Sequence, residues 1–231
     1  MPEENTKKKY RAIKSFVLRQ GRLTKAQQNA LDHYWQQYGI EYSDQILSPE
    51  KLFDNANDLV IEIGFGNGDS LLQQVKNQPQ LNFIGIEVHS PGVGHLIHNA
   101  NIENIENIKV VRHDAVEVLK HQIADDSVQQ FQLFFPDPWH KKRHNKRRII
   151  KPEFIQLIRK KLKPGGFFHM ATDWQPYAEH MLEQMDTAEG FINTSGSGEF
   201  SSNKGFRCET KFERRGLKLG HGVWDLIYKK S

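Results

Sequence analysis

The chain has 231 residues, enough for one α/β domain with a sizeable core and a short extension. Its apolar content of 37% and charged content of 26% are typical of a globular chain rather than a disordered one. No stretch approaches the roughly 18 uninterrupted apolar residues of a membrane span, and the polar start MPEENTKKKY has no apolar segment of the secretory kind. Cys208 is the only cysteine, which excludes an internal disulfide and a cysteine-based zinc site, and we expect a reducing, cytoplasmic location.

The net charge of +4 favours polyanionic partners only weakly, but the basic residues are unevenly placed. One cluster lies between Lys7 and Lys14, and a second runs from Lys141 to Arg148. The acidic residues are scattered through the middle of the chain. The position of the positive charge therefore says more about partners than the net charge does.

The chain begins with a basic arm over residues 1–15, followed by a predicted helix over 24–38. Aromatic and apolar residues recur at helical spacing in this segment, and Thr24 is suited to cap its first turn. We expect residues 1–45 to form an arm and helix that lie against the main domain. Residues 46–231 are expected to form that domain.

From residue 59 onward, predicted strands alternate with predicted helices. The predicted strands are 59–64, 82–87, 108–114, 128–135, 167–172 and 223–230. The predicted helices are 68–77, 94–101, 115–123, 152–163 and 176–185, of which the fourth is stopped by Pro164-Gly165-Gly166. Repeated β-α units of this length indicate an α/β fold with a Rossmann-like, doubly wound and mostly parallel sheet, and we expect its final strand to be antiparallel.

The sequence EIGFGNG leaves the first of these strands and opens a helix. Gly64, Gly66 and Gly68 let the backbone turn sharply and approach a ligand closely. A dinucleotide fold has the spacing G-x-G-x-x-G, whereas here the spacing is G-x-G-x-G and Asp69 would repel a pyrophosphate. Glu62 suits a ligand with a cationic amino group, such as S-adenosylmethionine, which also carries a sulfonium. The alternative is an ordinary glycine-rich turn.

Two further carboxylates follow successive strands. Glu87 ends the second strand, where it can accept the hydroxyls of a ribose, and Asp114 ends the third, where it can meet an adenine amino group. Each one alone is also explained as a helix cap or a solvated loop residue. Three acidic positions at three successive strand ends indicate a nucleoside pocket, because open α/β sheets bind ligands at the carboxyl ends of their strands.

The sharpest motif is FPDPWH, which runs directly into KKRHNKRR. Two prolines stiffen the turn around Asp137, and Trp139 offers a flat face for a base. Six of the eight residues from Lys141 to Arg148 are Lys or Arg, a dense phosphate-binding patch. Such a run is otherwise a solvated face or a nuclear-localisation signal, but its attachment to a rigid Asp and Trp favours an RNA substrate.

Histidines in this loop have the spacing of zinc ligands, but the surrounding cations would repel a metal, and we assign none.

Two later segments complete the candidate site, namely ATDW with Asp173 and TKFERRG with Glu213. Alone, Asp173 is explained as a helix cap and Glu213 as a surface ion-pair partner.

Together these residues resemble the tRNA (guanine-N7)-methyltransferases of the bacterial single-chain type. The match runs from about residue 11 to 229 and includes SFVLRQGRLTKAQQ, EIGFGNG, FPDPWHKKRHNKRR, ATDW and TKFERRG. His140 stands where many members have proline, which bears on the stiffness of the loop. The resemblance implies a class I methyltransferase fold, S-adenosyl-L-methionine as cofactor and guanine 46 of the tRNA variable loop as the target. It implies a monomer or homodimer without an obligate protein partner or a membrane.

The resemblance also assigns roles to residues. The cofactor site is expected to comprise Glu62, Gly64, Gly66, Gly68, Glu87, Asp114 and Asp137, with Asp137 the catalytic candidate. Substrate contacts are expected from Lys141, Asp173, Thr210, Lys211, Phe212 and Glu213. Further contacts with RNA are expected from Trp139, Lys142, Arg143, Lys146, Arg147 and Arg148.

Three other functions fit parts of the pattern. A methyltransferase acting on an exocyclic amine uses an Asp or Asn beside prolines and an aromatic residue, which Asp137-Pro138-Trp139 partly matches. A non-catalytic RNA-binding protein on the same fold is disfavoured by the intact glycines and Glu87. A nicotinamide oxidoreductase is disfavoured by the glycine spacing and the basic loop.

Overall fold

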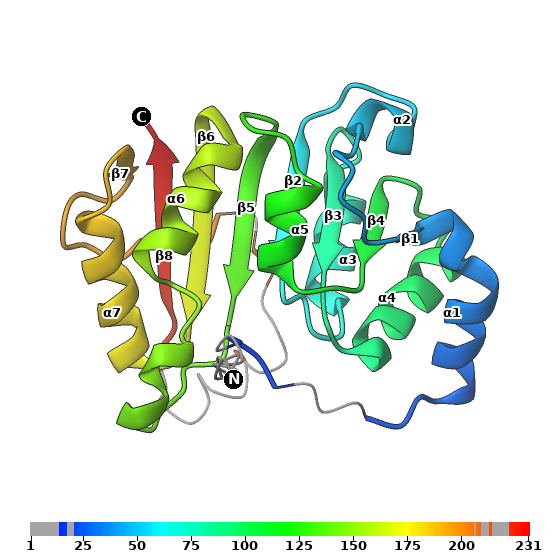
Figure 1. Ribbon diagram of the computed structural model, residues 1–231, viewed down its shortest axis with the longest axis horizontal. Coiled ribbons are helices and arrows are strands. Elements are labelled where there is room, and N and C mark those ends of the chain that lie inside the picture. The colour runs from blue at the N-terminus through cyan, green and yellow to red at the C-terminus, as the bar shows by residue number, and fades with distance from the viewer. Residues whose placement is uncertain (1–13, 18–20, 206, 209–212, 214–221) are drawn as a thin grey trace, which may run out of the picture.

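The computed structural model describes residues 14–17, 21–205, 207–208, 213 and 222–231. In this part of the chain, eight strands form one sheet in the order β1-β4-β3-β2-β5-β6-β8-β7 (Figure 1). The strands are β1 (Gly39–Ile40), β2 (Leu59–Ile63), β3 (Asn82–Ile86), β4 (Ile108–Val111), β5 (Val128–Phe134), β6 (Leu162–Thr172), β7 (Phe191–Asn193) and β8 (Trp224–Lys230). Neighbours from β1 to β6 are parallel, whereas β8 is antiparallel to β6 and β7 is antiparallel to β8. The predicted doubly wound, mostly parallel sheet with an antiparallel final strand is confirmed.

Seven α-helices and one 3₁₀ helix connect the strands in the described residues. They are α1 (Lys25–Tyr38), α2 (Pro49–Phe53), α3 (Asp69–Asn77), α4 (Ser90–Ile102), α5 (Ala115–His121), η1 (Lys142–Arg147), α6 (Pro152–Lys161) and α7 (Gln175–Asp186). In the described residues, no helix is both long enough and apolar enough to cross a membrane.

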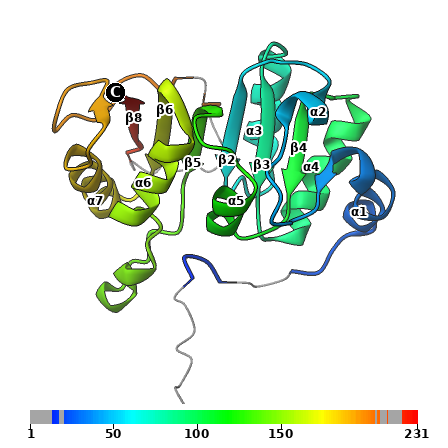
Figure 2. The same ribbon diagram turned by 45° about the horizontal axis from the view of Figure 1, so that its top comes forward.

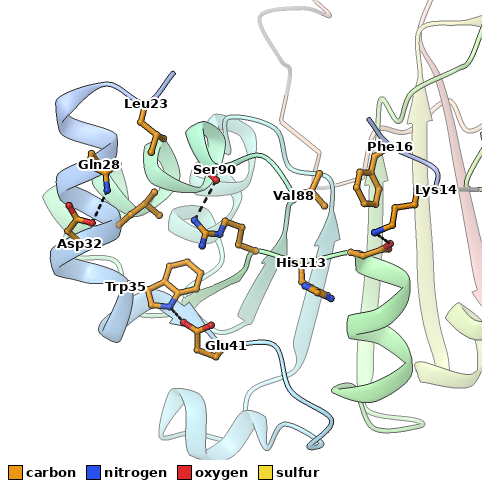
Figure 3. A pocket seen from close by; sticks show the side chains of 13 residues that line it. Lys14, Phe16, Leu23, Gln28, Asp32, Trp35, Glu41, Val88, Ser90 and His113 are labelled. Atoms are coloured by element: carbon orange, nitrogen blue, oxygen red, sulfur yellow. Dashed lines mark hydrogen bonds and ion pairs between the residues drawn. The ribbon is translucent and has the colours of Figure 1, made fainter. Parts of the chain in front are cut away.

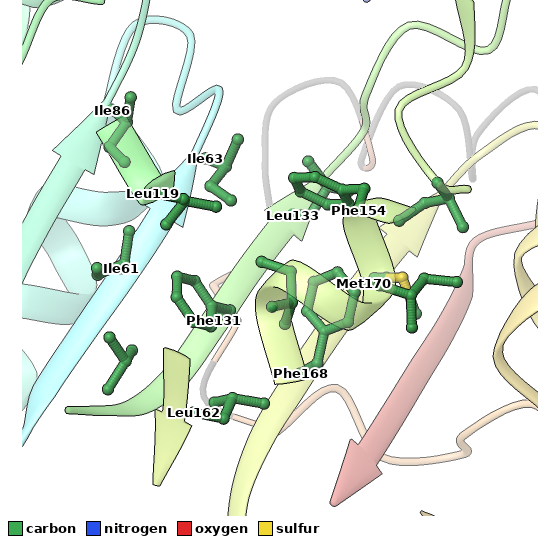
Figure 4. Packing of buried hydrophobic residues seen from close by; sticks show 14 of the residues in the cluster. Ile61, Ile63, Ile86, Leu119, Phe131, Leu133, Phe154, Leu162, Phe168 and Met170 are labelled. Carbon is green, nitrogen blue, oxygen red and sulfur yellow. The ribbon is translucent and has the colours of Figure 1, made fainter. Parts of the chain in front are cut away.

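Burial of the central strands on both faces explains why they read as continuous apolar runs. Every residue of β2 and of β3 is buried. One face packs Ile61, Phe131 and Phe168 into a cluster with residues of α5, α6 and α7 (Figure 4). The other face packs Val60 and Phe83 against α1, α3 and α4. A fully buried Phe of this kind contributes about 1.5–3 kcal/mol, so the two clusters fix the layered architecture.

The predicted helix over 24–38 is confirmed, and its first turn carries a complete capping box. The Thr24 hydroxyl accepts from the Gln27 backbone N–H at 3.2 Å, and the Gln27 side chain accepts from the Thr24 backbone N–H at 2.8 Å. Helix α1 packs on α4, where a side-chain carbon at Gly94 would lie 2.8 Å from the Gln27 carbonyl oxygen. After it, β1 joins the edge of the sheet beside β4.

Some predicted boundaries were wrong. The helix predicted over 152–163 ends at Lys161, because Leu162 is already extended and buried and pairs with Val128. Pro164-Gly165-Gly166 does not separate helix from strand but lies inside β6, where the register with β5 shifts. Helix α4 begins at Ser90, before the predicted start at residue 94. Strands β1 and β7 and helices α2 and η1 were not predicted.

The parallel strands direct their carboxyl ends to one edge of the sheet, which is where the site residues gather. The 3₁₀ helix η1, drawn in green, projects beyond this edge in both views, and the blue segment 14–17 lies beside it (Figures 1 and 2). A surface of this kind, built from loops on a rigid sheet, is where open α/β folds bind ligands.

Candidate functional site at the carboxyl edge of the sheet

The glycine turn after β2 adopts a backbone that only glycine takes without strain. Gly64 and Gly66 have φ values of 74° and 61°, and a side-chain carbon at either would meet nothing within 4 Å. The Gly64 N–H donates to the carbonyl of Ile86 at 2.7 Å, which ties the turn to β3. Gly68, with φ of 79°, caps α3. The turn thus presents open backbone at the end of the sheet, with room for a ligand.

Glu62 lies beneath this turn as a buried carboxylate. Its side chain is 4% exposed, and among the described residues its Oε2 atom has no hydrogen-bond partner. Burial, with a contribution from Glu87, raises the pKa of Glu62 to about 8. A buried carboxylate in this state favours an incoming cation, which would supply the missing partner.

Glu87 is held by three backbone N–H groups. Its Oε2 accepts from Gly66 at 3.0 Å, and its Oε1 accepts from Val88 at 2.6 Å and from His89 at 3.0 Å. A carboxylate offers about four acceptor positions, so this arrangement leaves one, on Oε2. Glu87 therefore fixes the glycine turn to the end of β3 and retains room for one further donor.

Asp114 caps a helix, as considered from the sequence, and also lines the cavity at the sheet edge. Its Oδ1 accepts from the Val116 N–H at 3.1 Å and caps α5, and its Oδ2 lies 3.7 Å from Lys14 Nζ. The same side chain lines the cavity described below. It therefore joins the N-terminal segment to the sheet edge.

The turn after β5 is strained at both of its ends. Phe135 and Trp139 have φ values of 50° and 51°, in a region that L-residues rarely adopt and that costs about 1–3 kcal/mol each. Between them, Pro136 and Pro138 flank Asp137, which is exposed. Strain of this kind persists only where the surrounding contacts determine it, and here it directs Asp137 to the sheet edge.

These elements enclose a cavity of about 210 Å³. Its lining includes Gly64, Glu87, Asp114 and Asp137, together with Phe16 of the N-terminal segment. The structure thus brings together carboxylates from the ends of three strands. The other predicted cofactor residues, Glu62, Gly66 and Gly68, do not line this cavity themselves.

A larger groove of about 750 Å³ adjoins the cavity between the N-terminal segment and α1. Phe16, His113 and Asp114 line both, and Trp35 and Glu41 form the far wall of the groove (Figure 3). Residues 14–16 therefore border two neighbouring spaces. Nothing in the sequence pattern indicated that Ser15 or Phe16 lines the site, because their contacts are with segments far along the chain.

The basic run forms η1 and the residues beside it. Lys142, Arg143 and Lys146 are exposed, as expected for phosphate contacts. The pKa of His144 is lowered by burial and by the surrounding Arg and Lys side chains, which reflects the positive potential of the loop.

Arg148 differs from the rest of this run. It is only 7% exposed, its Nε donates to the carbonyl of Pro138 at 3.1 Å, and its guanidinium lies 4.8 Å from the ring centroid of Tyr177. The expected contact of Arg148 with RNA does not fit this burial. Its contacts instead fix the end of the loop to the turn that carries Asp137.

Trp139 has neighbours that the sequence did not indicate. The Arg147 guanidinium lies 4.9 Å from its ring centroid, and His144 meets it edge-on at 5.9 Å. Its indole N–H donates to the carbonyl of Ser15 at 3.1 Å. The flat face expected to receive a base is therefore in contact with a cation in this structure.

Two of the predicted substrate residues, Lys141 and Asp173, are exposed at the carboxyl edge. Asp173 is not the helix cap considered from the sequence, because Trp174 occupies that position. Glu213 is 2% exposed and forms an ion pair with Arg207, so it is not the surface residue considered as the alternative. The remaining three predicted substrate residues, Thr210, Lys211 and Phe212, lie outside the described residues.

Within the described part of the chain, no cluster of three or more His, Cys, Asp or Glu side chains could hold a metal ion.

The chain is similar to known methyltransferases. A family model described as "Putative methyltransferase" matches residues 56–226. A curated tRNA (guanine-N(7)-)-methyltransferase from Cronobacter sakazakii is 57% identical over 94% of this chain and 91% of its own length. Another with the same name, from Aeromonas hydrophila, is 56% identical over 95% of this chain and 93% of its own length.

Among solved structures, the 16S rRNA methyltransferase KamB aligns with a TM-score of 0.56 at 14% identity. The alignment covers 79% of this chain and 92% of KamB. At this identity the likeness concerns the fold alone.

Proposed function

This chain belongs to the tRNA (guanine-N7)-methyltransferase family, and we propose that it takes its methyl group from S-adenosyl-L-methionine and delivers it to guanine 46 of the variable loop. Methylation of guanine N7 in tRNA is the activity that the family shares by name. The cofactor and the target nucleotide are the finer parts of the proposal. The observation that carries the cofactor is the cavity in which Glu87, Asp114 and Asp137 converge beside an exposed basic loop, whereas guanine 46 rests on the family resemblance.

The residues at the sheet edge fit the proposed cofactor. S-adenosyl-L-methionine supplies a methyl group on a cationic sulfonium. Glu62 offers a buried carboxylate whose Oε2 has no partner among the described residues, which suits the cofactor's amino group. Gly64 and Gly66 leave open backbone for its close approach, and Glu87 Oε2 retains one acceptor position for a ribose hydroxyl. Asp114 is in place to accept from an adenine amino group, while it also caps α5.

The chemistry at guanine N7 explains why the site needs few groups. N7 carries a lone pair and no proton, so its attack on the methyl group requires no general base. Positive charge moves to the purine ring without any net charge being created. Catalysis therefore depends on alignment and electrostatics. Asp137 is the residue we assign to the electrostatic role, because the strained turn places its carboxylate at the cavity.

We assign the basic loop to tRNA affinity. Lys142, Arg143 and Lys146 are exposed beyond the carboxyl edge of the sheet and can neutralise phosphates. Asp173 is exposed nearby and can accept from the guanine N1–H and amino group. A base drawn out of its stack would cost a few kcal/mol, which contacts of this kind offset. Because Cys208 is the only cysteine in the sequence, the chain cannot form an internal disulfide, which accords with our proposal that the enzyme works in the cytoplasm.

Nucleoside mass spectrometry tests the proposal directly. Bulk tRNA is incubated with the purified protein and isotopically labelled S-adenosyl-L-methionine, digested and analysed for labelled 7-methylguanosine. A single transcript with guanine at position 46 is compared with one in which only that guanine is replaced by adenine. The proposal expects label in the first transcript and none in the second. Label on an exocyclic amine, or equal label in both transcripts, would overturn it.

A further inference from the structure

One face of the sheet, opposite the cluster that includes residues of α5, α6 and α7, contains buried polar groups. Strands β5, β6 and β8 carry polar residues there, including Gln132, His169 and Asp225, which are all buried. Gly205 lies against this face, because a side-chain carbon at this position would be 3.5 Å from the His169 ring. Buried polar groups require partners. Gln132 donates to Gln74 of α3 at 2.8 Å, and Asp225 accepts from Arg207.

Arg207 is the central partner in this arrangement. It is 4% exposed, and it donates from Nε and Nη2 to the two carboxylate oxygens of Asp225 at 2.9 and 2.7 Å. The same guanidinium donates from Nη1 and Nη2 to Glu213. Asp225 is hydrogen-bonded on its other side to His169 Nε2 at 2.8 Å. One planar cation thus satisfies two buried carboxylates, as the fork of guanidinium donors allows and a lysine ammonium does not.

The titration of the three groups agrees with a tightly coupled ion network. Burial opposes the charge of Arg207, but its hydrogen bonds to Asp225 and Glu213 raise its pKa above the ordinary value. The pKa values of Glu213 and Asp225 are both lowered, because burial is outweighed by Arg207 and Lys204 at Glu213 and by His169 and Arg207 at Asp225. All three groups are therefore charged throughout the neutral range.

The guanidinium also contacts the turn that carries Asp137. It lies 5.9 Å from the ring centroid of Phe134 and 5.4 Å from that of Phe135, the residue at which the strained turn begins. The backbone next to Arg207 reaches the cofactor side as well, since the Ser70 hydroxyl donates to the carbonyl of Cys208 at 3.5 Å. Arg207 therefore lies between the cavity and Glu213.

We infer that Arg207 is a positioning residue for methyl transfer: one buried guanidinium holds Glu213 of the TKFE motif in a fixed place relative to Phe135 and the turn that carries Asp137. This inference rests on the proposed function, in which Asp137 faces the reacting base. Arg207 touches neither cofactor nor RNA in this role. It acts by aligning the two sides of the site, and alignment is what a reaction without a general base depends on.

A double-mutant cycle tests the inference. The variants are Arg207→Gln, Glu213→Gln and the double variant, and the measurement is single-turnover methylation of tRNA at saturating cofactor. Each single variant is expected to lose about tenfold or more in rate, and the double variant to be no more than about twofold slower than the slower single one. Rate losses that multiply in the double variant would overturn the inference, because the two residues would then act independently.

Two further variants separate positioning from folding. Lys204→Gln removes a cation that contacts the same Glu213 carboxylate at 2.6 Å, but its side chain is 48% exposed. Its rate is expected to stay within about threefold of the wild type, as for an exposed ion pair. Arg207→Lys keeps the charge and loses the fork, so its unfolding midpoint should fall less than that of Arg207→Gln, while its rate, measured well below both midpoints, still falls.

Cofactor affinity, measured by calorimetry without tRNA, completes the test. It is expected to stay within about threefold of the wild type in all of these variants, because none removes a cofactor contact. A loss of affinity as large as the loss of rate, or an equal rate loss in Lys204→Gln, would overturn the inference. The wild-type rate and product test the proposed function itself, so failure of one is distinguishable from failure of the other.

Discussion

The indole N–H of Trp139 donates to the carbonyl oxygen of Ser15 at 3.1 Å and joins two segments that are 124 residues apart in the sequence. Lys14 reaches Asp114 on the other side of the cavity, at 3.7 Å between Nζ and Oδ2. Residues 14–17 therefore lie between the strained turn and α5, with Phe16 in the cavity wall. The N-terminal segment is part of the site and not merely an appendage to it.

This relationship predicts that Trp139→Phe weakens cofactor binding. The substitution keeps an aromatic ring and removes the hydrogen bond to Ser15, whose net worth is about 0.5–1.5 kcal/mol. We expect the dissociation constant, measured by calorimetry without tRNA, to rise about two- to tenfold. Trp174→Phe is the control, because Trp174 contacts His140 and does not line the cavity. Equal affinities of the two variants would mean that the segment does not help to hold the cofactor.

Glu87→Ala is expected to weaken cofactor binding in the absence of tRNA. The variant loses a charge-assisted contact with the ribose, worth about 1.5–3 kcal/mol, or roughly ten- to hundredfold in the dissociation constant. It also releases the N–H groups of Gly66, Val88 and His89, so the glycine turn loses its anchor. Unchanged affinity by calorimetry would remove Glu87 from the ribose site.

The glycine turn and the carboxylates at the strand ends could be predicted because local sequence determines them. A strand, a turn and a helix follow one another within a few residues, and parallel strands bring their ends to one edge. The position of Asp137 followed in the same way from the two prolines around it. The doubly wound, mostly parallel sheet needed no more than this alternation of strands and helices, whereas the antiparallel final strand did not follow from it.

Long-range contacts could not be predicted from the sequence. Arg148 appeared to be one more cation in a basic run, but its hydrogen bond to Pro138 and its contact with Tyr177 bury it. Arg207 belongs to no motif and matters through Asp225 and Glu213, which come together only in the folded chain. The early start of β6 depends on the fit of Leu162 in the core, which overrides the helical pattern before it.

The difference between exposed and buried cations gives a prediction about tRNA binding. Replacing Arg143 and Lys146 by alanine should weaken binding and reduce the slope of log K against log salt by about 0.7–0.9 for each lost phosphate contact. Arg148→Gln should leave this slope nearly unchanged and lower the unfolding midpoint, because Arg148 contacts protein groups. Filter binding over a salt series measures both. If Arg148→Gln alone reduced the slope of log K against log salt by about one, Arg148 would have to be a phosphate contact after all.

The buried Glu62 predicts a change in stability with pH. Its pKa is raised from the ordinary 4.5 to about 8, so its contribution to stability is fully present below pH 4.5 and is lost as the pH rises through 8. Glu62→Gln cannot ionise, so its stability should not fall in this way. Without cofactor, the free energy of unfolding of Glu62→Gln relative to that of the wild type should increase from pH 5 to pH 8 by up to a few kcal/mol, and the difference in unfolding midpoint should increase with it. Thermal denaturation at both pH values measures this. A difference that does not change with pH would mean that Glu62 is not held in its protonated form.

The same variant has a matched test with cofactor. Saturating S-adenosyl-L-methionine should stabilise the wild type more than Glu62→Gln, because only the wild type offers a carboxylate to the cofactor's amino group. Equal stabilisation of both proteins would separate Glu62 from the cofactor site.

The last prediction concerns Asp137, which we expect to limit methyl transfer more than RNA binding. Its carboxylate lies at the cavity, in a turn whose ends at Phe135 and Trp139 hold strained backbone and whose exit is fixed by Arg148. These contacts leave the carboxylate exposed at the place where, in our proposal, cofactor and guanine meet. A negative charge there favours the positive charge that develops on the purine ring.

Asp137→Asn keeps the shape of the side chain and removes its charge, which makes it a cleaner test than alanine. Single-turnover methylation at saturating cofactor and tRNA isolates the chemical step. We expect the rate to fall at least about a hundredfold, as for the loss of one charge-stabilising group, with tRNA affinity nearly unchanged. Asp173→Asn is the matched control on the substrate side, where a lost contact with guanine should appear mainly in tRNA affinity. A near-normal rate in Asp137→Asn would leave alignment alone to account for catalysis, and the turn would then matter for where it holds the guanine and not for the charge it carries.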